Sequence, residues 1–423
     1  MLIALAFGLG IIPYHMAKVG EPQNSLVIRE TWYGFVNVIS RWLLISYCYA
    51  SINLRNESLI GHFMSNSVSA FTTRAHDLGG ICAAIVVFIL PLFLRRHFRR
   101  SIEMIVAIDR RLLALHFPMN YNRILGTTWL VLICVAALDI FVTVACLVCL
   151  ANMEVQPSWQ LTFLMIYDLV AISISICLFC AISRSLQRRL AQFHMVLKNL
   201  AHQWDSRSLK ATQKQRSLQC LDSFSMYTIV TKDPAEIIQE SMEIHHLICE
   251  AAATANKYFT YQLLTIISIA FLIIVFDAYY VLETLLGKSK RESKFKTVEF
   301  VTFFSCQMIL YLIAIISIVE GSNRAIKKSE KTGGIVHALL NKTKSVEVKE
   351  KLQQFSMQLM HLKINFTAAG LFNIDRTLYF TISGALTTYL IILLQFTSNS
   401  PSNNSHLYSC CEALNNITAN HTL

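Results

Sequence analysis

Long apolar runs separated by shorter polar stretches dominate this chain. Seven runs approach the roughly 20 mostly apolar residues that a helix needs to cross a bilayer. They lie at 32–54, 78–94, 125–150, 160–182, 261–282, 298–319 and 377–396. Because the hydrocarbon core offers no water to backbone groups, each run is predicted to be helical. The expected fold is an all-α membrane protein with seven transmembrane helices.

The stretches between the runs carry helical patterns of their own. Residues 183–200 continue the fourth run as an amphipathic helix, and residues 346–362 form another before the last run. Pro234 suits a first helical turn and opens a helix that leads into the fifth run. We expect these extensions to pack together below the membrane, with a polar loop at 204–232. Residues 1–14 lack a basic leader and a cleavage site, so they form an interfacial or buried entry segment.

The pattern divides the chain into five parts. These are an N-terminal segment (1–31), six membrane helices with cytoplasmic extensions (32–345), an anchor helix with a hinge (346–376), a final helix (377–396) and a tail (397–423). Composition agrees: the chain is 54% hydrophobic and 15% charged, whereas soluble proteins carry about 25% charged residues.

Basic residues predict the orientation. Arg95, Arg96, Arg99 and Arg100 follow the second run, Arg184, Arg188 and Arg189 follow the fourth, and Arg324, Lys327 and Lys328 follow the sixth. By the positive-inside rule these ends face the cytoplasm. The N-terminus is then cytoplasmic and the C-terminus extracellular. The basic loop at 288–296 does not fit the rule, because this orientation places it outside. This pattern accounts for the net charge of +11 without nucleic acid. We also expect Arg95–Arg100 to contact lipid headgroups. The alternative is that these residues bind one specific anionic lipid.

Glycosylation triplets test the same orientation. Those on the predicted outer side start at Asn56, Asn403, Asn416 and Asn420. Cys410 and Cys411 lie in the outer tail. The sequence does not distinguish a disulfide between one of them and Cys149 from a free thiol. No zinc-type cysteine spacing, catalytic constellation or phosphate-binding loop occurs, so we expect no enzyme activity, metal or cofactor.

Ionisable residues inside membrane runs need a partner or water. Arg41 and Asp139 lie at similar depths and are predicted to form a structural ion pair. A second group lies in the outer halves of the fourth to sixth runs: Asp168, Asp277, Gln307, Tyr167, Trp159, Tyr280 and Tyr311. Carboxylates and amides among aromatic rings suit a pocket for a small polar ligand, such as a sugar, or for a cationic alkaloid. The alternative is an aromatic belt at the membrane surface.

The last run carries the most specific motif. Thr388-Tyr389, five aliphatic residues and then Gln395-Phe396 resemble the signature of the insect gustatory receptor family. The preceding run at 366–376 and the pair Phe7-Gly8-Leu9 and Ile12-Pro13 are similar to that family too, while the tail after Phe396 is longer than usual. The resemblance implies a ligand-gated cation channel, assembled as a homo- or heterotetramer with the final helix of each subunit lining a central pore.

Within that implied pore, Gln395 would place a ring of amides around a partly dehydrated cation. Ile391 and Ile392, one turn away, would close the pore by dewetting, with Thr388 on the same helix. The alternative is that Gln395 caps the helix at the outer interface. The expected function is a non-selective cation channel gated by small extracellular tastants, in the plasma membrane of sensory neurons. A seven-span receptor signalling through G proteins and a small-solute transporter are the alternatives.

Overall fold

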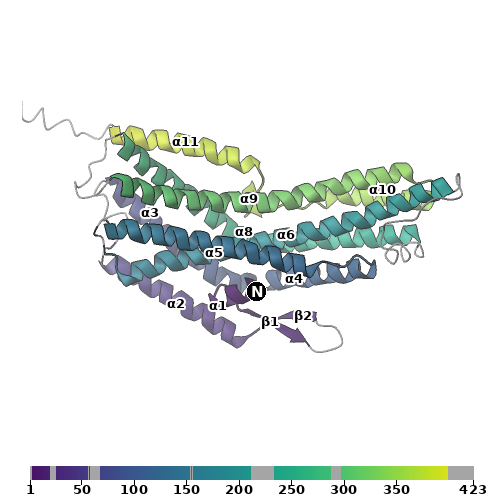
Figure 1. Ribbon diagram of the computed structural model, residues 1–423, viewed down its shortest axis with the longest axis horizontal. Helices are drawn as coiled ribbons and strands as arrows, with labels where there is room; N and C mark the ends of the chain where they lie inside the picture. Colours follow the sequence, from purple (N-terminus) through teal and green to yellow (C-terminus); the bar gives the residue numbers. More distant parts are fainter. Residues whose placement is uncertain are drawn as a thin grey trace, which may run out of the picture.

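The protein is an elongated helical bundle (Figure 1). The computed structural model describes residues 2–19, 25–55, 57, 67–152, 154, 156–210, 233–286 and 297–398. Seven helices in this part are long and apolar enough to cross a membrane. They are α2 (Trp32–Arg55), α3 (Ser67–Ala84) with its continuation α4 (Leu90–Ala114), α5 (Tyr121–Asn152), α6 (Trp159–Lys210), α8 (Pro234–Leu285), α9 (Thr297–Lys342) and α11 (Thr377–Ser398). All seven predicted runs therefore lie in helices, and a π-helical turn (Ile85–Ile89) joins α3 to α4.

Several helices continue far beyond the length of a bilayer. The 52 residues of α6 and of α8 each extend about 78 Å at 1.5 Å per residue, against roughly 30 Å of hydrocarbon. The extensions of α4, α6, α8 and α9 gather with α10 (Val346–His361) into a stalk at one end of the molecule (Figure 1). The predicted packing of these extensions against one another is confirmed, and α6 runs six residues past 204, where a loop was expected. The rest of that loop lies outside the described residues.

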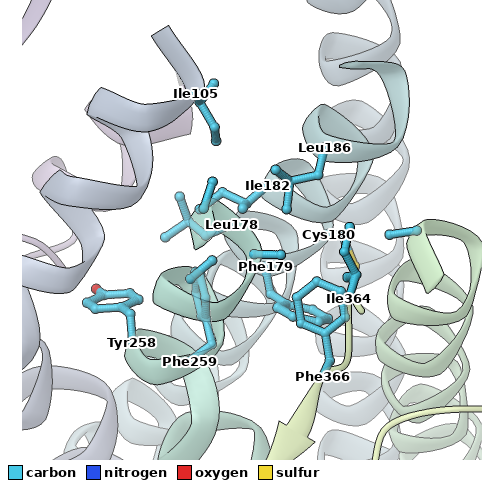
Figure 2. Close-up of a cluster of buried hydrophobic side chains, with 14 of the residues drawn as sticks. Ile105, Leu178, Phe179, Cys180, Ile182, Leu186, Tyr258, Phe259, Ile364 and Phe366 are labelled. Atoms are coloured by element: carbon cyan, nitrogen blue, oxygen red, sulfur yellow. The ribbon is translucent and has the colours of Figure 1, made fainter. Parts of the chain in front are cut away.

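An aromatic core joins the stalk to the membrane bundle. Phe179 on α6 meets Phe259 on α8 and Phe366 at ring-centroid distances of 5.6 and 5.5 Å, both edge to face. Ile364 and Phe366, from the segment between α10 and α11, insert into this cluster (Figure 2). Edge-to-face pairs add to the free energy gained by burial, so this segment is fixed to the bundle.

The segment before α11 forms a tight hairpin. Its strands β3 (Thr367–Ala368) and β4 (Phe372–Asn373) pair around Ala369 and Gly370, which have φ of +51° and +73°. Thr260 on α8 holds this turn, because its hydroxyl donates to the Thr367 carbonyl (3.1 Å) and accepts from the Ala369 N–H (2.6 Å). The hairpin sets where α11 begins.

Part of the N-terminal segment is buried, including Leu2, Ala6 and residues 11–14. The segment comprises α1 (Leu2–Gly8) and a hairpin of β1 (Tyr14–Val19) and β2 (Ser25–Glu30). Tyr14 stacks on Phe98 of α4 at 5.5 Å, and Asn37 on α2 donates to the Phe7 carbonyl at 2.5 Å. The buried entry segment was one of two expected forms; the hairpin was not predicted.

Candidate functional site

A cavity of ≈ 200 Å³ lies among the membrane helices, at the end of the bundle away from the stalk. Residues from α2, α3, α5, α6, α8 and α9 line it. Four residues of the predicted ligand group meet there: Asp168, Asp277, Gln307 and Tyr311. Segments far apart in the chain thus build one concave site, as is usual for small-molecule pockets.

The lining is acidic. Its carboxyl groups belong to Glu57, Asp77, Asp168 and Asp277, and none of the described lining residues is a lysine, arginine or histidine. Most of the remaining wall is aliphatic or aromatic. Carboxylates in such a low-dielectric setting attract positive charge strongly.

Asp168 is held by a hydroxyl from another helix. The Tyr49 hydroxyl on α2 donates to Asp168 Oδ2 at 2.9 Å. Gly80 on α3 makes room for this ring, since a Cβ at Gly80 would lie 2.9 Å from Tyr49 Cζ. The absence of a side chain at Gly80 therefore permits the hydrogen bond that orients Asp168.

Asp277 has different surroundings. It is 4% exposed, and its Oδ2 has no hydrogen-bond partner within the described part of the chain. Phe276, Phe303 and Phe304 line the cavity beside it. A buried carboxylate oxygen next to aromatic rings is suited to an organic cation, which both groups attract.

Three predicted ligand residues lie elsewhere. Tyr167 stacks between Phe88 and Phe163, and its hydroxyl donates to the Leu9 carbonyl at 2.5 Å. Trp159 starts α6 and is 59% exposed, while Tyr280 is buried against Tyr279 and Phe304 behind the cavity wall. These three side chains point away from the cavity, because neighbours on a helix point about 100° apart.

Sequence reasoning missed part of the lining, most notably Tyr49, Glu57 and Asp77. Asp77 lies one residue before the predicted second run (78–94), whereas the helix begins at Ser67. Tyr49 lies nearly five turns along the first run, at about 3.6 residues per turn, among other hydroxyl residues, and its own sequence context does not distinguish it. A carboxylate at the edge of a membrane run was the available signal for Asp77.

The last helix exposes one face and packs the other. Thr388, Ile391, Ile392 and Gln395 follow the i, i+3, i+4, i+7 spacing of a single helix face, and all are exposed. Only 6% of the most apolar window of α11 is buried, against 61% for α8. Leu390, Leu393 and Leu394 pack inward, and Tyr389 meets Phe271 edge to face at 6.0 Å. The pore residues proposed from sequence thus share the outward face of the subunit.

The predicted ion pair between Arg41 and Asp139 does not form. Asp139 instead accepts from the Ser173 hydroxyl at 3.0 Å, and Arg41 packs along Gly10. The ion pairs found among the described residues do not include either group. Similar depth again did not bring two side chains to facing sides of their helices.

The predicted glycosylation triplets and the two tail cysteines lie outside the described residues. These are the triplets at Asn56, Asn403, Asn416 and Asn420, together with Cys410 and Cys411. Cys149 is described and is a buried free thiol.

Comparisons with known proteins agree with this architecture. The family model for the 7tm chemosensory receptor matches residues 1–400. The chain is 62% identical over 399 residues to gustatory receptor 28b of Drosophila melanogaster, which covers 94% of this chain and 85% of that protein. The insect olfactory receptor OR5 from Machilis hrabei is similar in structure, with a TM-score of 0.63 at 13% identity over 93% of this chain and 97% of that one. The same receptor in complex with eugenol gives a TM-score of 0.61, at the same identity and coverage.

Proposed function

Because this chain belongs to the 7tm chemosensory receptor family, among the insect gustatory receptors, we propose that it is a ligand-gated, non-selective cation channel for small extracellular tastants. The family consists of receptors rather than enzymes, and the chain is a multi-pass protein of the plasma membrane. The observation that carries the proposal is that one aromatic cluster lies between the acidic cavity and α11.

That cluster gives ligand binding a route to the last helix. Phe276, Phe303 and Phe304 line the cavity, and they belong to the same buried cluster that Leu390, Leu393 and Leu394 pack against. A ligand that displaces the phenylalanine rings changes the surface on which α11 rests. The ligand opens the channel only by binding the open arrangement more tightly than the closed one.

The pore is proposed to form between copies. The face of α11 with Thr388, Ile391, Ile392 and Gln395 is exposed in one subunit. In a homo- or heterotetramer of gustatory receptors, four such faces would enclose a path for cations. Gln395 would supply amide oxygens near the outer mouth, and Ile391 and Ile392 would form the apolar constriction.

The acidic lining favours organic cations, such as protonated amines, over neutral or anionic tastants. Sugars are the second ligand class that carboxylates and an amide can bind, through hydroxyl groups. The similar olfactory receptor whose structure holds eugenol supports the view that this fold can enclose a small molecule. We favour the organic cation over the sugar because the described lining has four carboxyl groups and no basic residue.

The test measures ligand-evoked ionic current in excised membrane patches from a cell line without endogenous chemoreceptors. The chain is expressed alone and then with a second gustatory receptor, and is challenged with cationic bitter compounds, neutral bitter compounds and sugars. A current that persists in patches without guanine nucleotides supports a channel. A response that requires intact cells and nucleotide identifies a receptor that signals through G proteins and refutes the proposal.

The pore assignment has its own test. Gln395→Ala and Gln395→Glu should change the permeability ratios of monovalent and divalent cations, because the ring of amides is altered or charged. Tyr389→Phe, on a different side of α11, is the matched control and should leave the ratios unchanged. If the permeability ratios of all three variants equal those of the parent, the pore lies elsewhere.

A further inference from the structure

A second, smaller cavity of ≈ 40 Å³ lies between the first turns of α5 and the middle of α6, beside α1. Its two halves differ in chemistry. Val131, Cys177 and Ala181 line the half nearer the centre of the membrane bundle, and Arg184 and Arg188 line the half nearer the stalk. We call it the α5–α6 groove. An apolar wall that ends in guanidinium groups matches the two parts of a phospholipid.

The positive charge at this groove is not neutralised by the protein. Arg184 and Arg188 are close enough to repel each other electrostatically, and Arg123 at the start of α5 also repels Arg188. None of the three forms an ion pair with a carboxylate in the described part of the chain. Arg188 donates to the Thr127 hydroxyl, which leaves most of its N–H groups for another acceptor.

Neighbouring arginines show the contrast. Arg189, one residue further along α6, is 4% exposed and pairs with Asp109 on α4. Arg100 pairs with Glu250 on α8, and Arg111 pairs with Glu243. The bundle thus supplies carboxylates to Arg189, Arg100 and Arg111 but not to the three arginines at the α5–α6 groove.

We propose that the α5–α6 groove binds an anionic phospholipid of the cytoplasmic leaflet. Arg184 and Arg188, with Arg123 beside them, would hold the phosphate, since guanidinium groups bind phosphate oxygens through paired hydrogen bonds. An acyl chain would lie along Val131, Cys177 and Ala181. The lipid would then bridge α5, α6 and the N-terminal helix, because Leu2 also lines the groove. The proposal uses the predicted orientation of the chain but not its channel activity.

The test is native mass spectrometry of the purified full-length protein, titrated with phosphatidylinositol 4,5-bisphosphate, phosphatidylserine or phosphatidylcholine. The expected order of occupancy follows headgroup charge. Arg184→Gln/Arg188→Gln should weaken binding of the bisphosphate lipid roughly tenfold or more, because each basic residue near a membrane surface contributes about a factor of five. Ala181→Leu retains every charge and should also weaken binding by narrowing the apolar half.

The matched control is Arg110→Gln/Lys349→Gln, which removes two exposed basic residues, one on α4 and one on α10, and gives the same change in net charge. This control should bind the lipid like the parent. Equal loss in both double variants would overturn the proposal, because attraction would then depend on overall charge alone. Soluble inositol trisphosphate that binds as tightly as the lipid would also overturn it, since the apolar wall would contribute nothing. If the Gln variant does not fold, Arg184→Lys/Arg188→Lys provides the measurement: it should weaken binding, and unchanged affinity would refute recognition by guanidinium groups.

Discussion

Asp168 and Asp277 line the same cavity, but only one of them has a hydroxyl donor. Asp168 accepts from Tyr49, whereas Asp277 Oδ2 has no partner among the described residues. Asp277 is therefore the carboxylate that a cationic ligand can satisfy. Asp277→Asn should raise the half-maximal concentration of a cationic agonist by roughly tenfold or more, because hydrogen bonds to charged groups contribute about 1.5–3 kcal/mol.

The control for Asp277→Asn is Asp139→Asn, which neutralises a buried carboxylate outside the cavity lining. Its agonist response should match the parent at equal surface expression. Dose–response curves for a cationic and a neutral agonist provide the measurement. A shift of the same size for both agonists would contradict a charge-based role for Asp277.

Gly80 provides a second prediction at this scale. Gly80→Ala should displace the Tyr49 ring and remove the donor from Asp168, because the new Cβ would lie 2.9 Å from Tyr49 Cζ. The change in agonist sensitivity should equal that of Tyr49→Phe, and combining the two should add little, as expected for coupled sites. Gly126→Ala, where no atom lies within 4 Å of the added Cβ, should unfold at an equal or higher temperature. Additive effects of Gly80→Ala and Tyr49→Phe would show that they act separately.

The helix that carries each residue was predictable, whereas the side of the helix on which it lies was not. Asp168 and Tyr167 are adjacent in sequence, yet one lines the cavity and the other donates to the Leu9 carbonyl. Hydropathy gives a position along the helix axis, but rotation about that axis depends on which neighbours pack where. The same reason explains why Arg41 and Asp139 do not meet.

At the scale of elements, the start of α11 is tied to α9. Arg376 donates to both carboxylate oxygens of Glu320, at 2.8 and 3.0 Å, and Asp375 caps α11 by accepting from the Thr377 N–H at 2.8 Å. The pKa of the Arg376 guanidinium is raised by its hydrogen bond to Glu320. This two-bonded contact fixes the register between the two helices.

Charge reversal tests this tie. Glu320→Arg and Arg376→Glu should each reduce agonist-evoked current, because like charges then separate the start of α11 from α9. The double variant should recover much of the current by restoring the pair in reverse. Arg324→Glu serves as the control, since Arg324 lies 3.7 Å from Glu320 on the same helix and does not reach α11. No recovery in the double variant would show that the pair does not position α11.

Helices were easier to predict than the short strands. Runs of apolar residues and Pro234 located the helices, and Asp233 caps α8 by accepting from the Ala235 N–H at 3.3 Å. The hairpins β1–β2 and β3–β4 have strands of six and two residues. The two-residue strands are too short to show a pattern, and contacts such as Thr260 with Ala369 hold the β3–β4 turn. In β1 and β2 the adjacent apolar residues Met16-Ala17 and Leu26-Val27-Ile28 break the alternation that would indicate a strand.

At the scale of the molecule, the orientation is a prediction that two exposed positions can test. Trp159 starts α6 near the cavity end, and Met360 lies on α10 in the stalk; they are 59% and 71% exposed. Trp159→Cys should react with a membrane-impermeant thiol reagent on intact cells, and Met360→Cys only after permeabilisation. An N-terminal epitope tag should behave like Met360→Cys. The parent chain, with its native cysteines, gives the background labelling, and the opposite pattern would invert the topology.

The nearly unburied α11 has a consequence for inheritance. If the conducting path is shared between neighbouring copies, an allele that alters Gln395 or Ile391 alters every assembly that contains its product. Such an allele should act dominantly in a heterozygous animal. An allele that weakens only the cavity of its own copy leaves the shared path intact, and should be closer to recessive.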